Sequence, residues 1–304
     1  MSIKLKDQLS WEEFLKESTK EKIITEVKPF NRLIAHSKNF FIVAGYGSFT
    51  DGYVLIITKD FIPSFGLIEN EMLEEVNFLL KLLKINFKEN YNKNAVVFEH
   101  GMCACIGGLD RAHLHLMSVN ENTTEESLKG SIENALYKRK AGIKSIHFQK
   151  YKLENIHDIN QFMEENEYKE GVDYTVEGKL LKLIDIKDLK FEEWPLITLD
   201  HITKGGHYVY FKSDFANTSF LTKHNFQTQF GRQVVFENEM HLSEEFRIKI
   251  KKLIDNNPMI EAWKWQSCVF EEGIIETVNN TRKKLKDYNS KFESEYQEYE
   301  FKIL

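Results

Sequence analysis

Residues 109–119 read LDRAHLHLMSV, and this segment decides both the predicted fold and the predicted chemistry. Side chains alternate between the two faces of a β-strand, so every second residue shares a face. We therefore expect one face of this strand to enter the core, with Ala112, Leu114 and Leu116. The opposite face carries the polar set, which consists of Arg111, His113, His115 and Met117.

Two histidines placed in this way lie about 6.5–7 Å apart along the strand. Because like charges disfavour the charged form, we expect His113 and His115 to be neutral beside Arg111 and beside each other. A neutral imidazole is a usable nucleophile or base, and a partner histidine can act as an acid. The backbone N–H groups of Gly107 and Gly108 can approach a phosphate closely. This pattern indicates attack on phosphorus, with the oxygens held by Arg111 and backbone donors.

A metal site is the main alternative for a His-x-His pair. Residues 107–115 fit the Gly-x5-His-x-His spacing of cupins, but cupins are all-β, and a long helix is predicted immediately upstream. Cys103 and Cys105 with His100 offer three ligands, whereas a closed zinc site needs four. We therefore predict no metal and no cofactor.

The flanking segments predict an α+β fold with an antiparallel sheet. Residues 40–43 and 53–57 are β-branched and aromatic and are separated by a glycine-rich loop, which is typical of paired strands. Residues 69–88 carry apolar residues at helical spacing, and residues 95–98 and 112–119 are expected to be strands. The order strand, strand, helix, strand, strand favours a sheet with one long helix packed on it.

The second half of the chain is less regular. A capping box at residues 10–13 predicts an N-terminal helix, and residues 120–170 are expected to be irregular with short helices. Residues 206–211 and 219–222 read as a hairpin, and residues 226–237, 243–254 and 275 onward read as helices. The last helix should pack on the body, with a homodimer contact as the alternative. We divide the chain into a helical arm (1–28), a core (29–125) and an α+β extension packed on it (126–304).

Composition narrows the function classes. The chain has 304 residues, of which 13% are aromatic and only four are proline, so a disordered protein is excluded. It carries 41 Lys and Arg against 47 Asp and Glu, a formal net charge of −6, which disfavours bulk nucleic acid as a partner. Charges stand where a signal peptide needs its apolar run, and no membrane span is visible, so we expect a soluble, cytoplasmic chain.

Residues 30–120 resemble a histidine-triad (HIT) domain. The match runs through residues 39–43, 52–59 and 62–65 and then the strand at 111–119, which is similar to the family's His-φ-His-φ-His-φ-φ motif. Residues 99–101 (EHG) resemble a segment of bacterial HIT-like proteins that precedes D-H-A-H-L-H. More weakly, residues 208–210, 228–232, 263–265 and Thr277 resemble the C-terminal tail of the same bacterial group.

The resemblance implies residue roles. His113 matches the middle histidine, the nucleophile that forms a nucleotidyl-histidine, and His115 matches the last, which is associated with the leaving group. An alternative register makes His113 the first histidine, His115 the middle one and Met117 the third. On the predicted helix, Gln229 and Arg232 share one face, and Arg232 could pair a phosphate bidentately.

Three positions depart from the family pattern. Arg111 stands where the first histidine is expected, so another group must orient the nucleophile, and Glu99 or His100 is the candidate. Gly45 stands where many family members carry an Asp for the ribose. Tyr53 replaces the histidine of the family's G-H element.

The function implied by this resemblance is a nucleotide phosphoanhydride hydrolase, a nucleotidyltransferase or a phosphorylase. It would act through a nucleotidyl-histidine on a small-molecule nucleotide such as a dinucleoside polyphosphate or nucleotide sugar. The alternatives are a catalytically degenerate protein that binds nucleotide or RNA, and a metal-dependent His-x-His enzyme.

Overall fold

The computed structural model describes most of the region around the predicted site. The described residues are 32–60, 62, 65, 68–101, 111–138, 150–153, 174–176, 179–186, 207–215, 218–223, 229–238, 241–242, 244–258 and 260–304. The predicted N-terminal helix, Gly107, Gly108 and both Cys103 and Cys105 lie outside these residues.

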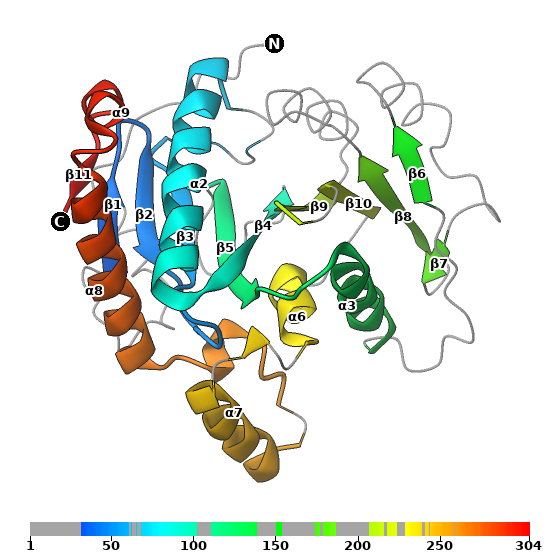
Figure 1. Cartoon of the computed structure of the whole chain (residues 1–304). Coiled ribbons are helices and arrows are strands. Elements are labelled where there is room, and N and C mark those ends of the chain that lie inside the picture. Colours follow the sequence, from blue (N-terminus) through cyan, green and yellow to red (C-terminus); the bar gives the residue numbers. More distant parts are fainter. Residues whose placement is uncertain are drawn as a thin grey trace.

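The described chain forms an α+β fold around one sheet (Figure 1). Its strands are β1 (Leu33–His36), β2 (Phe40–Ala44), β3 (Val54–Thr58), β4 (Lys93–Gly101), β5 (His113–Asn120), β6 (Lys150–Leu153), β7 (Tyr174–Val176), β8 (Lys179–Ile186), β9 (His207–Ser213), β10 (Thr218–Lys223) and β11 (Lys302–Ile303). Its helices are α2 (Asn70–Tyr91), α3 (Glu125–Lys138), α6 (Phe230–Phe236), α7 (Glu244–Asn256), α8 (Glu271–Tyr288), α9 (Glu293–Glu298) and a 3-10 turn, η5 (Trp265–Ser267).

The sheet has the strand order β11-β1-β2-β3-β5-β4-β9-β10-β8-β6, with β7 paired to β8. Its pairs are antiparallel except for β6 with β8. The order places β5, the strand of the histidines, between β3 and β4. This confirms the predicted antiparallel α+β architecture with a long helix.

The two faces of the sheet bury separate apolar clusters, as the alternation of side chains requires. Ala112, Leu114 and Leu116 lie in the cluster beneath α2 and α8, which run side by side on that face (Figure 1). Met117 and Val119 lie in the other cluster, with residues of α3, α6 and α7. The predicted assignment of β5 residues to opposite faces is therefore confirmed.

Helix α2 follows the predicted periodicity. Its buried face consists of Met72, Leu73, Val76, Leu79, Leu80, Leu83 and Phe87. It ends where Asn92 takes a left-handed conformation (φ 48°), which lets the Asn92 N–H bond to the carbonyl of Lys88. Together with α8, it covers the face of the sheet opposite to the histidines.

Irregular structure with short helices is predicted for residues 120–170, whereas residues 125–138 form a single helix of 14 residues. This segment is α3, whose first turn is capped because Thr124 and Ser127 exchange side-chain-to-backbone hydrogen bonds. Leu128, Ile132 and Ala135 fill its buried face. Their spacing of four and three residues was the available sequence signal, but the few apolar residues among many polar ones gave a weak period.

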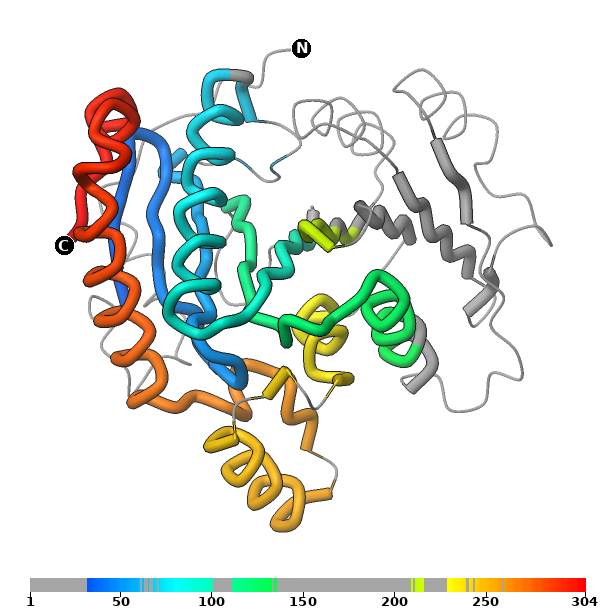
Figure 2. Tube along the Cα trace, in the orientation of Figure 1, coloured from blue at the N-terminus to red at the C-terminus, as the bar shows by residue number. Residues whose placement is uncertain are grey.

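The predicted hairpin is confirmed as β9 and β10, and the later helices are confirmed with shifted ends. Helix α6 begins only at Phe230, because the left-handed conformation of Gln229 (φ 62°) excludes that residue from the helix. Helices α8 and α9 then pack on the body beside α2, β1 and β2. In the tube view, the last residues of the chain run beside β1 (Figure 2).

Among the described residues, no helix is both long enough and apolar enough to cross a bilayer.

Candidate active site

His113 and His115 lie at the N-terminal end of β5, in the middle of the sheet. In register, His113 pairs with Ile57 of β3, and His115 pairs with Leu55 on one side and Phe98 of β4 on the other. The ring centroids of His113 and His115 are 4.8 Å apart and the rings are inclined by 62°. Both residues are partly exposed. The strand therefore holds two imidazoles in contact on one accessible face.

The hydrogen bond of His113 fixes its tautomer. Its Nδ1 lies 2.9 Å from the carbonyl oxygen of Arg111. A carbonyl only accepts, so Nδ1 carries the proton and Nε2 of the neutral ring keeps its lone pair. Burial lowers the pKa of His113, and the bond to the Arg111 carbonyl opposes that shift only in part. His113 is thus a neutral imidazole whose unbonded nitrogen is nucleophilic at pH 7.

His115 is held between two aromatic rings. The Phe98 ring stacks on it at 4.6 Å and 6°, and the Tyr53 ring lies nearly parallel at 6.0 Å. The Tyr53 hydroxyl is 2.7 Å from Nδ1 of His115. This clamp leaves Nε2 as the polar atom of His115 that can face a ligand.

Burial, more than neighbouring charge, keeps His115 neutral. Burial lowers the pKa of His115 well below its ordinary value, and the smaller electrostatic effects of His113, His100 and Arg232 act in the same direction. We expected the cation to be Arg111, but Arg232 is the arginine close enough to act. The neutral state was predicted correctly, and its main cause was not.

Arg111 supports the site through its backbone as well as its side chain. The residue is 5% exposed, and its guanidinium donates to the carbonyl of Lys59 at 2.8 Å. Its own carbonyl receives the His113 Nδ1–H. Residue 111 therefore supplies the group that orients the His113 ring from the main chain.

Glu99 lies on the wrong face of β4 to orient the nucleophile. Phe98 belongs to the cluster on the histidine face and Val97 to the cluster under α2, so alternation puts Glu99 on the α2 side. Its buried carboxylate accepts the N–H of Phe65 at 2.8 Å. The candidate role of Glu99 as the orienting group is therefore replaced by the Arg111 carbonyl.

His100 does lie on the histidine face. Its ring centroid is 6.3 Å from that of His115, and its Nε2 accepts the Gly231 N–H at 2.9 Å. Burial, with a smaller effect of His113, lowers its pKa to about 3. His100 is therefore a neutral third imidazole that ties the N-terminus of α6 to β4.

Gln229 binds the protein itself. It precedes α6, so it does not share a helical face with Arg232. Its side chain bonds the Trp265 N–H at 2.7 Å and the Gln266 amide at 3.0 Å. Gln229 thereby fastens the start of α6 to η5.

Arg232 is likewise occupied by the protein: it is 1% exposed, and four of its five N–H groups donate to acceptors of the protein. These acceptors are the carbonyls of Trp263, Tyr46 and Gly47 and the sulfur of Cys268. A phosphate contact of the expected kind would have to displace one of these acceptors. In this conformation Arg232 holds the loop between β2 and β3.

The two departures, at Gly45 and at Tyr53, are linked because the Tyr53 ring occupies the space next to residue 45. A Cβ built on Gly45 would fall inside van der Waals contact of the Tyr53 ring. An Asp at position 45 is therefore incompatible with Tyr53 as placed. The exchange removes a carboxylate and brings a hydroxyl to His115.

Sequence reasoning missed the clamp around His115, which consists of Tyr53 and Phe98, and the bond from Gly231 to His100. These contacts depend on which strands are neighbours and on where α6 docks, and a single strand's pattern carries neither. No group of three or more His, Cys, Asp or Glu within the described residues is arranged to hold a metal ion.

No protein-family model matches the sequence, and no curated protein matches it either. The solved structures that are similar to the chain include yeast Ap4A phosphorylase Apa2 and the same enzyme in complex with Ap4A. Each has 8% sequence identity and a TM-score of 0.35 over 76% of this chain, covering 72% and 74% of the respective solved chain. The likeness is slight, and the function proposed below rests on the geometry of the site.

Proposed function

We propose that this chain is a HIT-like enzyme that acts on nucleotide phosphoanhydrides through a nucleotidyl-histidine. His113 is the nucleophile and His115 supports the departing group or a phosphate oxygen. The acceptor that ends the cycle is water in a hydrolase, phosphate in a phosphorylase, or another group in a transferase. Dinucleoside polyphosphates and nucleotide sugars are the substrate classes.

One observation carries the proposal: Nδ1 of His113 donates to a main-chain carbonyl at 2.9 Å while its ring is neutral. The lone pair is thereby assigned to Nε2, on the face shared with His115. The same bond stabilises the ring when Nε2 becomes bonded to phosphorus, because the modified ring gains positive charge and its Nδ1–H becomes a stronger donor. It also favours the register in which His113, and not His115, attacks.

The steps balance without a cofactor. Nε2 of His113 forms a bond to the α-phosphorus, and the bond from phosphorus to the bridging oxygen breaks, with the electron pair leaving on the oxygen. In the second step an oxygen of the acceptor bonds to phosphorus and the N–P bond returns its pair to Nε2. When water is the acceptor, its proton passes to solvent or to the released phosphate.

Substitution of the nucleophile tests the assignment. We expect His113→Ala to reduce turnover of any nucleotide that the enzyme cleaves by about 10³-fold or more, because the variant lacks the Nε2 atom that bonds to phosphorus. Turnover is measured by chromatography of the products from dinucleoside polyphosphates and nucleotide sugars.

His36→Ala is the matched control, since it removes a partly exposed imidazole from β1, away from the pair. It should leave turnover nearly unchanged. Full turnover by His113→Ala would refute the assignment, and tight nucleotide binding without turnover by the wild-type chain would favour the degenerate binding protein.

A further inference from the structure

The surroundings of Tyr53 bear on which nitrogen of His115 carries the proton. It directly precedes β3, is 2% exposed, and its hydroxyl is 2.7 Å from Nδ1 of His115. That contact by itself does not say which of the two groups donates, since a hydroxyl does either and a histidine nitrogen does either. The direction depends on what else lies beside the Tyr53 oxygen.

Arg232 settles the direction. The carbon of its guanidinium lies 5.2 Å from the Tyr53 ring centroid, so a positive charge stands beside the phenol. A positive charge attracts the lone pairs of the hydroxyl oxygen and repels its proton, so the O–H bond points away from Arg232. The hydroxyl proton of Tyr53 is then directed at Nδ1 of His115, and a neutral His115 carries its own proton on Nε2.

We propose that the chain Arg232–Tyr53–His115 fixes His115 as a neutral Nε2–H donor, with Tyr53 as its positioning residue. The two histidines then present opposite groups on one face, a lone pair on His113 and an N–H on His115. This inference deepens the function proposed above and rests on it for its consequence in catalysis. The geometric part, the tautomer of His115, stands independently.

The groups that face His115 come from four elements and agree with a neutral ring. They are Tyr53 beside β3, Phe98 and His100 on β4, His113 on β5 and Arg232 on α6. None of these described groups is a carboxylate that would favour an imidazolium. Burial also raises the pKa of Tyr53 against the opposing charge of Arg232, so a proton relay that leaves a tyrosinate is disfavoured.

A neutral N–H donor restricts the leaving group. It can hydrogen-bond to an oxygen that gathers negative charge, but it is a poor source of a proton. A phosphate leaves from an anhydride as a stable anion and needs none, whereas an amine leaving from a phosphoramidate must be protonated. The enzyme should therefore cleave phosphoanhydrides in strong preference to nucleoside phosphoramidates.

The decisive comparison is between His115→Gln and His115→Asn in the full chain. The Gln amide nitrogen reaches the place of Nε2 and donates, whereas Asn is too short to do so. We expect His115→Gln to keep diadenosine tetraphosphate turnover within about 10-fold of wild type and His115→Asn to lose about 10²-fold or more. If both variants fall together by the roughly 10²–10⁴-fold typical of a lost general acid, the neutral-donor assignment is overturned.

Tyr53→Phe tests the positioning role. We expect kcat to fall about 10-fold with KM unchanged, the kinetic equivalent of one lost hydrogen bond. The control is Tyr296→Phe, which removes a buried hydroxyl bonded at 2.7 Å to the carbonyl of Leu285 in the other cluster. Equal kcat in the two variants would show that Tyr53 acts on stability alone.

A nitrogen-15 NMR spectrum of histidine-labelled protein at pH 7 tests the tautomer of His115 separately from the proposed function. We expect the His115 signals, assigned by their loss in His115→Gln, to report a neutral ring protonated at Nε2. A ring protonated at Nδ1, or at both nitrogens, overturns the inference even if nucleotides are cleaved. If no nucleotide is cleaved, the proposed function fails while the tautomer is still decided.

Discussion

At the scale of single residues, the site and its surroundings are defined by where protons sit on buried or partly buried imidazoles. His113 donates from Nδ1 to a carbonyl, whereas His100 accepts at Nε2 and His241 accepts at Nδ1 from backbone N–H groups. A backbone carbonyl can only accept and a backbone N–H can only donate, so each of these hydrogen bonds assigns the tautomer of the histidine. Strand alternation alone predicted which residues share a face, but the tautomers required the partners.

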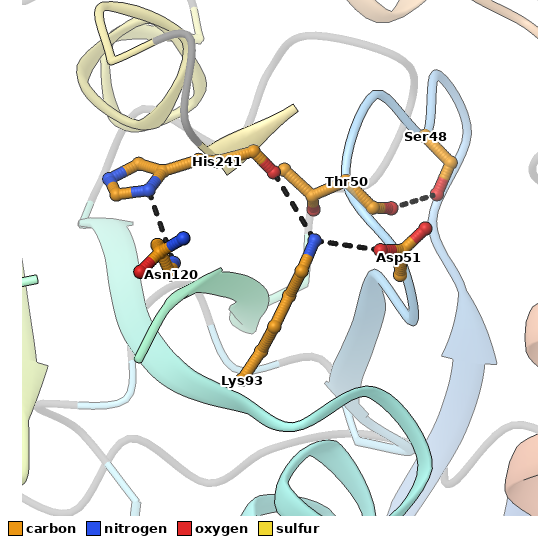
Figure 3. A network of polar contacts seen from close by, with 6 residues as sticks. All are labelled: Ser48, Thr50, Asp51, Lys93, Asn120 and His241. Atoms are coloured by element: carbon orange, nitrogen blue, oxygen red, sulfur yellow. Dashed lines mark hydrogen bonds and ion pairs between the residues drawn. The ribbon is translucent and has the colours of Figure 1, made fainter. Parts of the chain in front are cut away.

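His241 shows what such a buried ring does for stability. It is 2% exposed and accepts the Asn120 N–H at 3.2 Å, while its carbonyl lies 3.5 Å from the ammonium of Lys93, which is paired with Asp51 at 2.7 Å (Figure 3). Burial, assisted by the charge of Lys93, lowers the pKa of His241 to about 4. This network joins the end of β5 to the start of β4 and to the loop after β2.

The lowered pKa predicts acid sensitivity of the fold. Between about pH 6.5, the ordinary histidine value, and pH 4, the unfolded chain binds a proton at residue 241 that the folded chain does not. Stability from this group is therefore complete above pH 6.5 and falls as the pH drops, by up to about 1.4 kcal/mol per pH unit. The free energy of unfolding by urea, measured from about pH 7 to pH 4.5, should show this decline.

His241→Asn is the comparison that isolates the residue, because Asn offers an acceptor near the place of Nδ1 and does not titrate. We expect the decline with falling pH to be shallower in the variant than in wild type. Carboxylates contribute equally to both proteins and cancel in the difference. Parallel curves would contradict the account of His241.

At the scale of elements, the site depends on how closely α6 approaches β4. The approach is close because Gly231 has no side chain: a Cβ there would fall inside contact distance of the Phe98 ring, which stacks on His115. The Gly231 N–H also bonds to His100. One glycine therefore sets both the aromatic clamp and the third histidine.

Gly231→Ala should accordingly reduce both stability and turnover. We expect overpacking to remove about 1–3 kcal/mol from the free energy of unfolding. We also expect kcat to fall by about 10-fold or more, because Phe98 must move away from α6 and toward His115. The free energy of unfolding and kcat, both measured on the same preparation, report the two effects.

Gly130→Ala is the matched control. Gly130 lies in α3, and no described atom lies within 4 Å of the place that a Cβ would take there. The change should therefore be neutral or stabilising by about 0.5–1 kcal/mol. If Gly231→Ala were as well tolerated as Gly130→Ala, the close approach of α6 to β4 would be wrong.

At the scale of the whole molecule, one sheet runs through both halves of the chain. β4 pairs with β5 on one edge and with β9 on the other, and β1 pairs with β11, the last strand of the chain. The boundary set near residue 125 therefore falls between β5 and α3 without interrupting the sheet. Residues beyond it supply α6, Arg232 and Gly231 to the site.

The parts of the fold that follow from local pattern were predictable. The helical period over Met72 to Phe87 indicated α2, and the alternation around His113 and His115 indicated β5 and its two faces. Long-range neighbours were not predictable, because nothing in the pattern of residues 53–57 says that Tyr53 meets His115 across β3 and β5. Arg232 shows the same limit: its sequence context suggested a phosphate ligand, whereas most of its acceptors are carbonyls from distant loops.

The most direct test of the central claim is the intact mass of the full chain after brief incubation with nucleotides at pH 7. If His113 attacks the α-phosphorus, the mass should increase by one nucleotidyl group, whose value identifies the nucleotide. The adduct should be lost on acid treatment, as a bond between phosphorus and histidine nitrogen requires, and should be absent from His113→Asn. An adduct of equal yield on His113→Asn would contradict the account, as would rapid turnover by wild type with no adduct at any time point.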